Sequence, residues 1–232
     1  MNIISAVYCE AIKIRRSKVF WFSFLLFAAA LAMMSFGIEP RNWESFFDRF
    51  LALAANMGLV GSFFISSWVF GREFTDKTNK DLVAKPVSRE TVVFSKYIII
   101  FIWCIIFMLF IYLFSLMMGL LLGFTGYTPS LIPESLPVFI LTFLFYIFLS
   151  APGAFFASIS KGILAPIGIL FIIAIAANIL GNTEAAVYFP WTIPTVFRET
   201  GSLIPASIVI MILTGAAGII GTFAWWRFAE QG

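Results

Sequence analysis

Charged residues and histidine are what this sequence has least of. Only 12% of its 232 residues are charged and none is histidine, whereas soluble domains have about 25% charged residues. Two cysteines are present. Cys9 lies in a charged N-terminal segment and Cys104 in an apolar run, so we expect free thiols rather than a disulfide. Without histidine or clustered cysteines and carboxylates in the apolar runs, no ligands remain for a metal site.

The apolar runs also lack every group that energy conversion or catalysis would need. They contain no Asp, Glu, Lys or Arg, so a proton relay at membrane depth has no carrier. No GxxxxGK[ST] phosphate loop occurs anywhere in the chain. Intramembrane hydrolysis would need a base or a carboxylate pair. We therefore expect that the chain is not an enzyme by itself, and that another chain supplies the energy for any uphill transport.

Apolar residues are abundant instead. The chain is 61% hydrophobic, with 29 phenylalanines, and six runs approach the roughly 20 residues that cross a bilayer as a helix. The sequence therefore predicts an all-α integral membrane protein with six transmembrane helices in a single domain, residues 1–232. Pro152 and Gly153 predict a kink near the end of the fourth run. The predicted spans are 19–38, 50–70, 97–124, 136–158, 163–180 and 203–226.

The distribution of basic residues predicts the orientation. Lys and Arg accumulate in cytoplasmic segments. With the N-terminus inside and six spans, only Arg41, Arg49 and Arg198 of the 15 basic residues fall outside. Both termini are therefore expected on the cytoplasmic side.

The N-terminal segment has two interpretations. Residues 2–17 place apolar side chains at helical spacing beside Lys13, Arg15 and Arg16, which is typical of an interfacial amphipathic helix. The alternative is a short disordered basic tail. The first apolar run imitates a signal peptide, but it is long for that role, so we expect an uncleaved signal-anchor.

Two spans carry stripes of small residues that allow close helix approach. Packing within the chain and association between subunits both remain open for these stripes. Asn56 and Asn178 are polar outliers that either form hydrogen bonds between helices or contact a solute. The stripes consist of Ala54, Gly58, Ser62 and Ser66 in the second run, and of Thr214, Gly218 and Thr222 in the sixth.

Charge is concentrated between the second and third spans. Residues 71–96 hold ten charged side chains. A short amphipathic helix through Leu82 is expected to stop before Pro86. Ser88 then caps a second helix, with Glu90 in its first turn, that leads into the third span. The alternative is a solvated basic loop.

This loop resembles the first cytoplasmic loop of ABC-2 type exporter permeases. That family typically shows an acidic residue after the second span, a Gly/Thr-containing turn, a leucine, Pro-x-Ser-Arg and a lysine that opens the third span. Here Asp76-Lys77 stands where many members have Gly-Thr. Six spans, an amphipathic N-terminal helix and a long outer loop extend the resemblance over the whole chain. The matching residues are Glu73, Thr75, Asp76, Lys77, Thr78, Leu82, Pro86, Val87, Ser88, Arg89 and Lys96.

The resemblance implies a permease subunit of an ABC transporter. Two permease subunits, identical or paralogous, would form the pathway in the lipid membrane, and separate ATPase subunits would bind ATP and Mg²⁺. This chain would bind no cofactor and no nucleic acid. The implied ATPase-coupling residues are Glu73, Lys77, Lys80, Leu82, Pro86 and Arg89.

The resemblance also implies a substrate path along the second and fifth spans. The outer segment 181–202 would form re-entrant or interfacial pieces over the exit; a plain aromatic belt is the alternative. The chain is similar to small permeases of bacitracin, lantibiotic and toxin export or self-immunity systems in bacterial cytoplasmic membranes, and its apolar, aromatic interior suits hydrophobic or amphipathic peptides. The candidate path residues are Asn56, Phe63, Phe64, Asn178 and Trp191.

Two other functions compete with export. The chain could be a membrane scaffold or sensor whose basic loop recruits a partner or anionic lipid. A passive channel ranks third, because no ring of charged residues is available to select ions.

Overall fold

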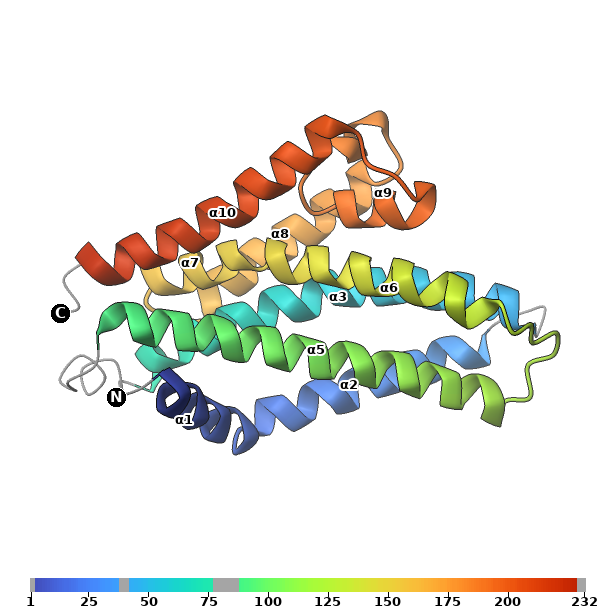
Figure 1. Ribbon diagram of the computed structural model, residues 1–232, viewed down its shortest axis with the longest axis horizontal. Coiled ribbons are helices and arrows are strands. Elements are labelled where there is room, and N and C mark those ends of the chain that lie inside the picture. Colours follow the sequence, from blue (N-terminus) through green and yellow to red (C-terminus); the bar gives the residue numbers. More distant parts are fainter. Residues whose placement is uncertain (1–2, 38–41, 77–87, 229–232) are drawn as a thin grey trace.

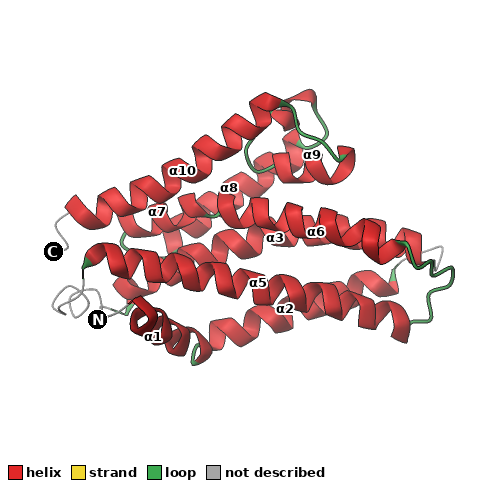
Figure 2. Ribbon diagram, in the orientation of Figure 1, coloured by secondary structure: helices red, strands yellow, loops and turns green. Residues whose placement is uncertain are grey.

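The protein is helical throughout the part that the computed structural model describes, residues 3–37, 42–76 and 88–228. No strand occurs in these ranges, and their regular elements are α-helices with one short 3₁₀ helix (Figures 1 and 2). The elements are α1 (Ile3–Arg15), α2 (Lys18–Phe36), α3 (Trp43–Thr75), α5 (Arg89–Leu121), α6 (Leu131–Leu149), α7 (Ala151–Ile159), α8 (Leu164–Leu180), η1 (Glu184–Val187), α9 (Ile193–Thr200) and α10 (Pro205–Phe228).

Five helices in the described ranges are long and apolar enough to cross a membrane: α2, α3, α5, α6 with α7, and α10. Helices dominate because a bilayer offers no water to satisfy backbone polar groups. The apolar helix α8 has 17 residues and is about 25 Å long, slightly less than a hydrocarbon core of about 30 Å. The all-helical fold is thus confirmed for the described residues, with five candidate membrane spans, and the sixth crossing, by α8, stays a prediction.

The helix boundaries differ from the predicted spans mainly in α3 and α5. Both have 33 residues: α3 extends beyond its apolar run at both ends, and α5 begins eight residues before its run and ends three residues earlier. Ser88 caps α5, because its side chain accepts a hydrogen bond from the Thr91 N–H, and Glu90 lies in the first turn as predicted. The predicted coupling helix falls on residues 77–87, outside the described ranges.

The predicted kink near Pro152 is present as a break between two helices. Helix α6 ends at Leu149, and α7 begins at Ala151 with proline in its first turn. The proline has no N–H to donate and so fits a helix start.

Helix α3 occupies the centre of the bundle. It contacts α5, α6, α7 and α8, and the two chain termini lie at one end of the molecule (Figure 1). We call this end the termini end and the opposite one the far end. Placing both termini at one end agrees with an even number of crossings.

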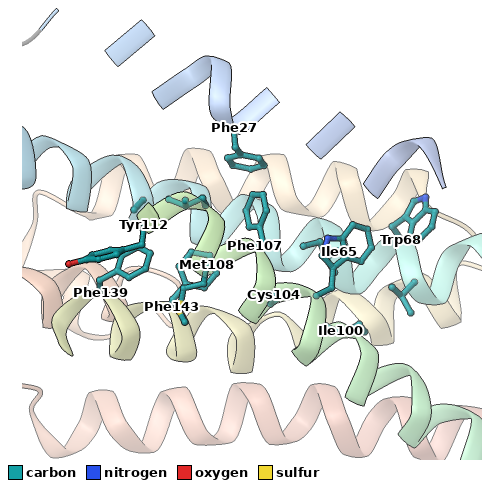
Figure 3. Packing of buried hydrophobic residues seen from close by; sticks show 14 of the residues in the cluster. Phe27, Ile65, Trp68, Ile100, Cys104, Phe107, Met108, Tyr112, Phe139 and Phe143 are labelled. Atoms are coloured by element: carbon teal, nitrogen blue, oxygen red, sulfur yellow. The ribbon is translucent and has the colours of Figure 1, made fainter. Parts of the chain in front are cut away.

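The core between the helices is rich in aromatic rings. The rings of Phe27 in α2 and Phe107 in α5 meet edge to face with centroids 4.5 Å apart. Figure 3 shows this pair and, further along the core, Tyr112 against Phe139. Aromatic pairs of this geometry add about 0.5–1.5 kcal/mol beyond the burial of their area. Much of the packing between helices therefore depends on phenylalanine.

The small-residue stripes pack within the chain. A Cβ added at Gly58 would lie 3.0 Å from the Tyr146 ring of α6, and Ser62 donates a hydrogen bond to the Tyr146 carbonyl. On α10, a Cβ at Gly218 would lie 2.6 Å from the carbonyl carbon of Ala151. The stripes therefore serve contacts of α3 with α6 and of α10 with α7.

Gly218→Ala should destabilise the protein by about 1–3 kcal/mol, because the new methyl group meets backbone that cannot rotate away. Gly168→Ala is the matched control on α8: nothing lies within 4 Å of its added Cβ, and helix propensity favours alanine by up to about 1 kcal/mol. Thermal unfolding of both variants in detergent measures the difference. A Gly218→Ala variant with wild-type stability would contradict the packing.

Candidate functional site

Four charged side chains form a cluster near the termini end, which we call the ion cluster. The Lys96 Nζ of α5 lies 3.0 Å from Oε2 of Glu10 in α1 and 2.9 Å from Oε1 of Glu73 in α3. The Lys13 Nζ lies 2.8 Å from the Glu10 carboxylate and 2.9 Å from that of Glu73. The side chain of Lys96 is 0% exposed and that of Glu73 is 1% exposed. The ion cluster therefore joins three helices through the buried Glu10, Glu73 and Lys96 and through Lys13, whose side chain is 32% exposed.

Local sequence explains how these charges become buried. Ala6, Glu10 and Ile14 are the buried residues of α1, and their spacing of four places them on one helix face. Glu73 and Lys96 become internal because α3 and α5 extend beyond their apolar runs. The Lys96 ammonium also donates to the Val69 carbonyl at 3.4 Å.

The charges within the ion cluster balance. Two carboxylates face two ammonium groups, so desolvation of each ion is offset by opposite charges at contact distance. Burial opposes ionisation of Glu10, but Lys96 and Lys13 outweigh it and lower the pKa of this carboxyl group. Burial likewise opposes the charge on Lys13, but Glu10 and Glu73 raise its pKa above the usual value. Both residues that α1 contributes to the ion cluster, Glu10 and Lys13, are therefore charged at neutral pH.

The predicted ATPase-coupling residues do not form one site in the described structure. Glu73 is buried in the ion cluster, so its carboxylate is not presented at the surface as a direct contact with a partner would require. Arg89 lies at the start of α5 and donates to the carbonyls of Trp226 at 3.3 Å and Arg227 at 3.5 Å in α10. The remaining four, Lys77, Lys80, Leu82 and Pro86, lie outside the described residues.

Sequence reasoning did not find the ion cluster. It assigned Lys96 to a loop that ended where the third span was predicted to begin, and it interpreted residues 2–17 as an interfacial amphipathic helix without assigning a partner to Glu10. Two signals were available. Glu10 is the sole acidic residue among the first 38 residues and precedes Lys13 by three positions. An acidic residue after span two and a lysine opening span three were also part of the family pattern.

The N-terminal helix is formed, so a disordered tail is wrong for residues 3–15. The contacts of α1 with other helices were not predicted from the sequence. Helix α1 packs against α5, and it does so with a face that includes Glu10, while Ile4 is 77% exposed. Placement of α1 in the membrane interface stays a prediction.

A second feature is a cavity toward the far end, between α3, α6, α8 and α9. Its volume is about 190 Å³. Three of the predicted path residues line it: Asn56, Asn178 and Trp191. Phe63 belongs to an adjoining apolar cluster with Leu59 and Tyr146, which also line the cavity, and Phe64 packs against that cluster. The structure thus brings together side chains from segments far apart in the sequence.

Among the described residues, the two asparagines form hydrogen bonds within their own helices and not between helices. The Asn56 Nδ2 donates to the Ala52 carbonyl at 3.2 Å, and the Asn178 Nδ2 donates to the Ala174 carbonyl at 2.8 Å. Both are bonds to the preceding turn of their own helix. The expectation of an interhelical hydrogen bond is therefore wrong, and both residues line the cavity.

Residues 181–202 form short helices that pack on the bundle at this cavity. Helix α9 contacts α6 and α3, and the Tyr146 hydroxyl lies 2.9 Å from the Thr195 hydroxyl of α9. Trp191 donates from its indole nitrogen to the Leu149 carbonyl at 3.3 Å. Ligand pockets usually measure about 300–1,000 Å³, so the cavity is large enough for a side chain but not for a whole peptide.

Comparison with known proteins establishes the class of this chain. A family model described as ABC-2 family transporter protein matches residues 6–177. Because this match covers most of the sequence, the chain belongs to the ABC-2 transporter family. It is thus a multi-pass membrane protein and a transporter permease subunit, not an enzyme by itself, and family membership implies an ABC ATPase partner.

One curated relative is informative. The bacitracin transport permease protein BCRB of Bacillus licheniformis is 26% identical over 195 residues, which cover 82% of this chain and 93% of the relative. The similarity therefore includes nearly the whole of that permease.

Lys96→Met should destabilise the protein by about 3–5 kcal/mol, because it leaves two buried carboxylates with Lys13 alone. Lys18→Met makes the same chemical change at an exposed position and should shift stability by less than about 0.5 kcal/mol. Adding Glu73→Leu to Lys96→Met restores charge balance and should regain part of the loss. Thermal unfolding in detergent tests this, and equal effects at positions 96 and 18 would contradict the ion cluster.

The ion cluster also predicts a pH dependence. The lowered pKa of Glu10 means that its stabilisation is present above the ordinary value of 4.5 and is lost as pH falls through the folded-state value. Glu10→Gln should therefore lower the unfolding temperature at neutral pH, and the difference from wild type should shrink in acid. A difference that stayed constant down to acid pH would show that the charge of Glu10 contributes nothing. On the alkaline side, the stabilisation from Lys13 persists below 10.5 and is lost as pH rises through its raised pKa.

Proposed function

We propose that this chain is the permease subunit of an ATP-driven exporter of hydrophobic or amphipathic peptides. The observation that carries the proposal is the similarity to a bacitracin transport permease over 93% of its length. In this proposal ATP and Mg²⁺ bind to a separate ATPase subunit, and two permease copies or paralogues assemble into one pathway.

We infer that the termini end faces the cytoplasm. Helix α1, whose last turn holds Lys13 and Arg15, lies at this end, and so do the end of α3, the start of α5 and the end of α10 with Arg227 (Figure 1). This arrangement agrees with the accumulation of Lys and Arg on the cytoplasmic side. The cavity beside α9 is then near the outer surface.

The ion cluster supports a route by which an ATPase could move the spans. The connection from α3 to α5 is flanked by one member of the cluster on each side, Glu73 in the last turn of α3 and Lys96 near the start of α5. A partner that shifts the connection would act on both helices together. Glu10 and Lys13 would transmit the same shift to α1. In this account Glu73 couples from inside the protein rather than by touching the ATPase.

The far-end cavity supports peptides as the substrate class. Asparagine amides can donate to and accept from a peptide backbone, and the neighbouring aromatic rings offer surfaces for apolar side chains. A cavity of about 190 Å³ corresponds to a closed conformation of this path. Transport would require α8 or α9 to move away from α3.

Co-reconstitution with a cognate ABC ATPase tests the proposal. The permease should stimulate ATP hydrolysis, and cells that express both subunits should resist bacitracin-type peptides. Asn56→Ala and Asn178→Ala should each reduce resistance about five- to tenfold through the loss of one polar contact, with normal membrane insertion. Ile179→Ala, at a 66% exposed position one residue from Asn178, is the control and should have little effect.

Three outcomes separate the alternatives. Failure of every cognate ATPase to bind or respond would exclude the exporter. Resistance that persists without the ATPase would indicate a sensor or a passive channel. ATPase stimulation without peptide resistance would retain the transporter and exclude this substrate class.

A further inference from the structure

A basic pocket lies at the termini end, between the end of α1, the last turns of α3 and the connection from α7 to α8. Its volume is about 560 Å³. Three cationic residues line it: Lys13, Arg16 and Arg72. Apolar residues complete its walls, among them Trp68 and Ile163. The pocket therefore combines positive charge with apolar surface, and it is separate from the far-end cavity.

The arginines supply the unbalanced charge of this pocket. Lys13 is neutralised within the ion cluster, which has no net charge. Arg16 is exposed and forms no ion pair with the described residues. Arg72 has an acidic neighbour, since its Nε lies 3.7 Å from Asp76 Oδ2. One positive charge remains after this pairing.

The guanidinium group of Arg72 is fixed in position, but one of its hydrogen-bond donors is unsatisfied in the described structure. Its guanidinium carbon lies 4.5 Å from the centroid of the Trp68 ring, which positions the planar group by a cation–π contact. Its Nη1 is buried and has no hydrogen-bond partner in the described structure. A buried donor without an acceptor costs about 1–3 kcal/mol. An oxygen of an anionic ligand would satisfy it, and guanidinium groups match phosphate geometry well.

The position of the pocket along the membrane helices indicates which kind of phosphate compound it binds. Ser17 lines it and caps the start of α2, where its side chain accepts from the Val19 N–H at 3.1 Å. Asp76, also in the lining, ends α3. Both residues lie at the ends of helices that are long and apolar enough to cross a membrane. Lipid headgroups occupy this depth, and basic pockets between helices on the cytoplasmic side bind anionic headgroups.

We propose that this pocket binds the phosphate headgroup of an anionic phospholipid such as phosphatidylglycerol. Arg16 and Arg72 contact the phosphate, and the apolar walls around Trp68 and Ile163 receive the start of the acyl chains. A zwitterionic lipid carries its own cation and binds these arginines less well. The bound lipid connects α1 to α3 beside the ion cluster. This site is independent of which substrate the transporter exports.

Lipid titration of the purified permease tests the proposal without any ATPase. Phosphatidylglycerol should raise the unfolding temperature in a saturable manner, while phosphatidylcholine and free glycerol phosphate should not. The combined Arg16→Gln and Arg72→Gln variant should weaken the apparent affinity for phosphatidylglycerol at least about tenfold, the loss expected for two charge-assisted hydrogen bonds. Arg15→Gln removes the same charge from the adjacent position, which does not line the pocket, and should bind like wild type.

Each outcome decides the assignment. Equal weakening by Arg15→Gln would reduce the effect to general surface charge and overturn the site. Saturable binding of glycerol phosphate alone would identify a soluble phosphate ligand instead of a lipid. No preference for phosphatidylglycerol, combined with loss of ATPase copurification in the arginine variant, would assign the pocket to the partner protein. If Arg72→Gln does not fold, Arg16→Gln alone is compared with Arg15→Gln.

Discussion

The termini end of this protein depends on charge balance among the buried side chains of the ion cluster. Lys96 is completely buried, and an isolated ammonium group there would be untenable. Its charge requires Glu73 and Glu10, and two carboxylates in turn require Lys13. Because these residues come from α1, α3 and α5, none of the three helices can be displaced alone without leaving a charge uncompensated. The ion cluster thus makes three helices behave as a single mechanical unit.

The two ends of the bundle use different chemistry. At the termini end, ionic contacts and arginines create strong, directional interactions that are sensitive to pH and to lipid charge. At the far end, the cavity is lined mostly by neutral amides, hydroxyl groups and aromatic rings, together with the paired Arg198 and Glu199, and the neutral contacts separate at lower cost than buried ion pairs. This difference suits a transporter in which one end receives force from a partner and the other end opens. Helix α3 extends from Trp43 beside the far end to Thr75 beside the termini end and connects the two.

Much of the fold could be predicted from the sequence because lipid imposes simple rules. Apolar runs without charges became helices, Ser88 capped α5, and Pro152 interrupted a span. Helices α3 and α5 continue past the charges at which the predicted spans end, and there Glu73 and Lys96 neutralise each other inside the protein. The two asparagines singled out from the sequence both line the far-end cavity, but spacing could not show that their amides bond to their own helices. No local pattern could show that α1 buries Glu10, since that depends on Lys96, 86 positions away in the sequence.

The close packing of Gly218 against the start of α7 determines where a label could report helix movement. Backbone lies directly on backbone there, and Arg89 holds the last carbonyls of α10 at the start of α5. The C-terminal helix therefore has little freedom to slide on either neighbour. A fluorescent or spin label placed near residue 228 would move together with α5 and α7, so its displacement would report how these two helices tilt during a transport cycle.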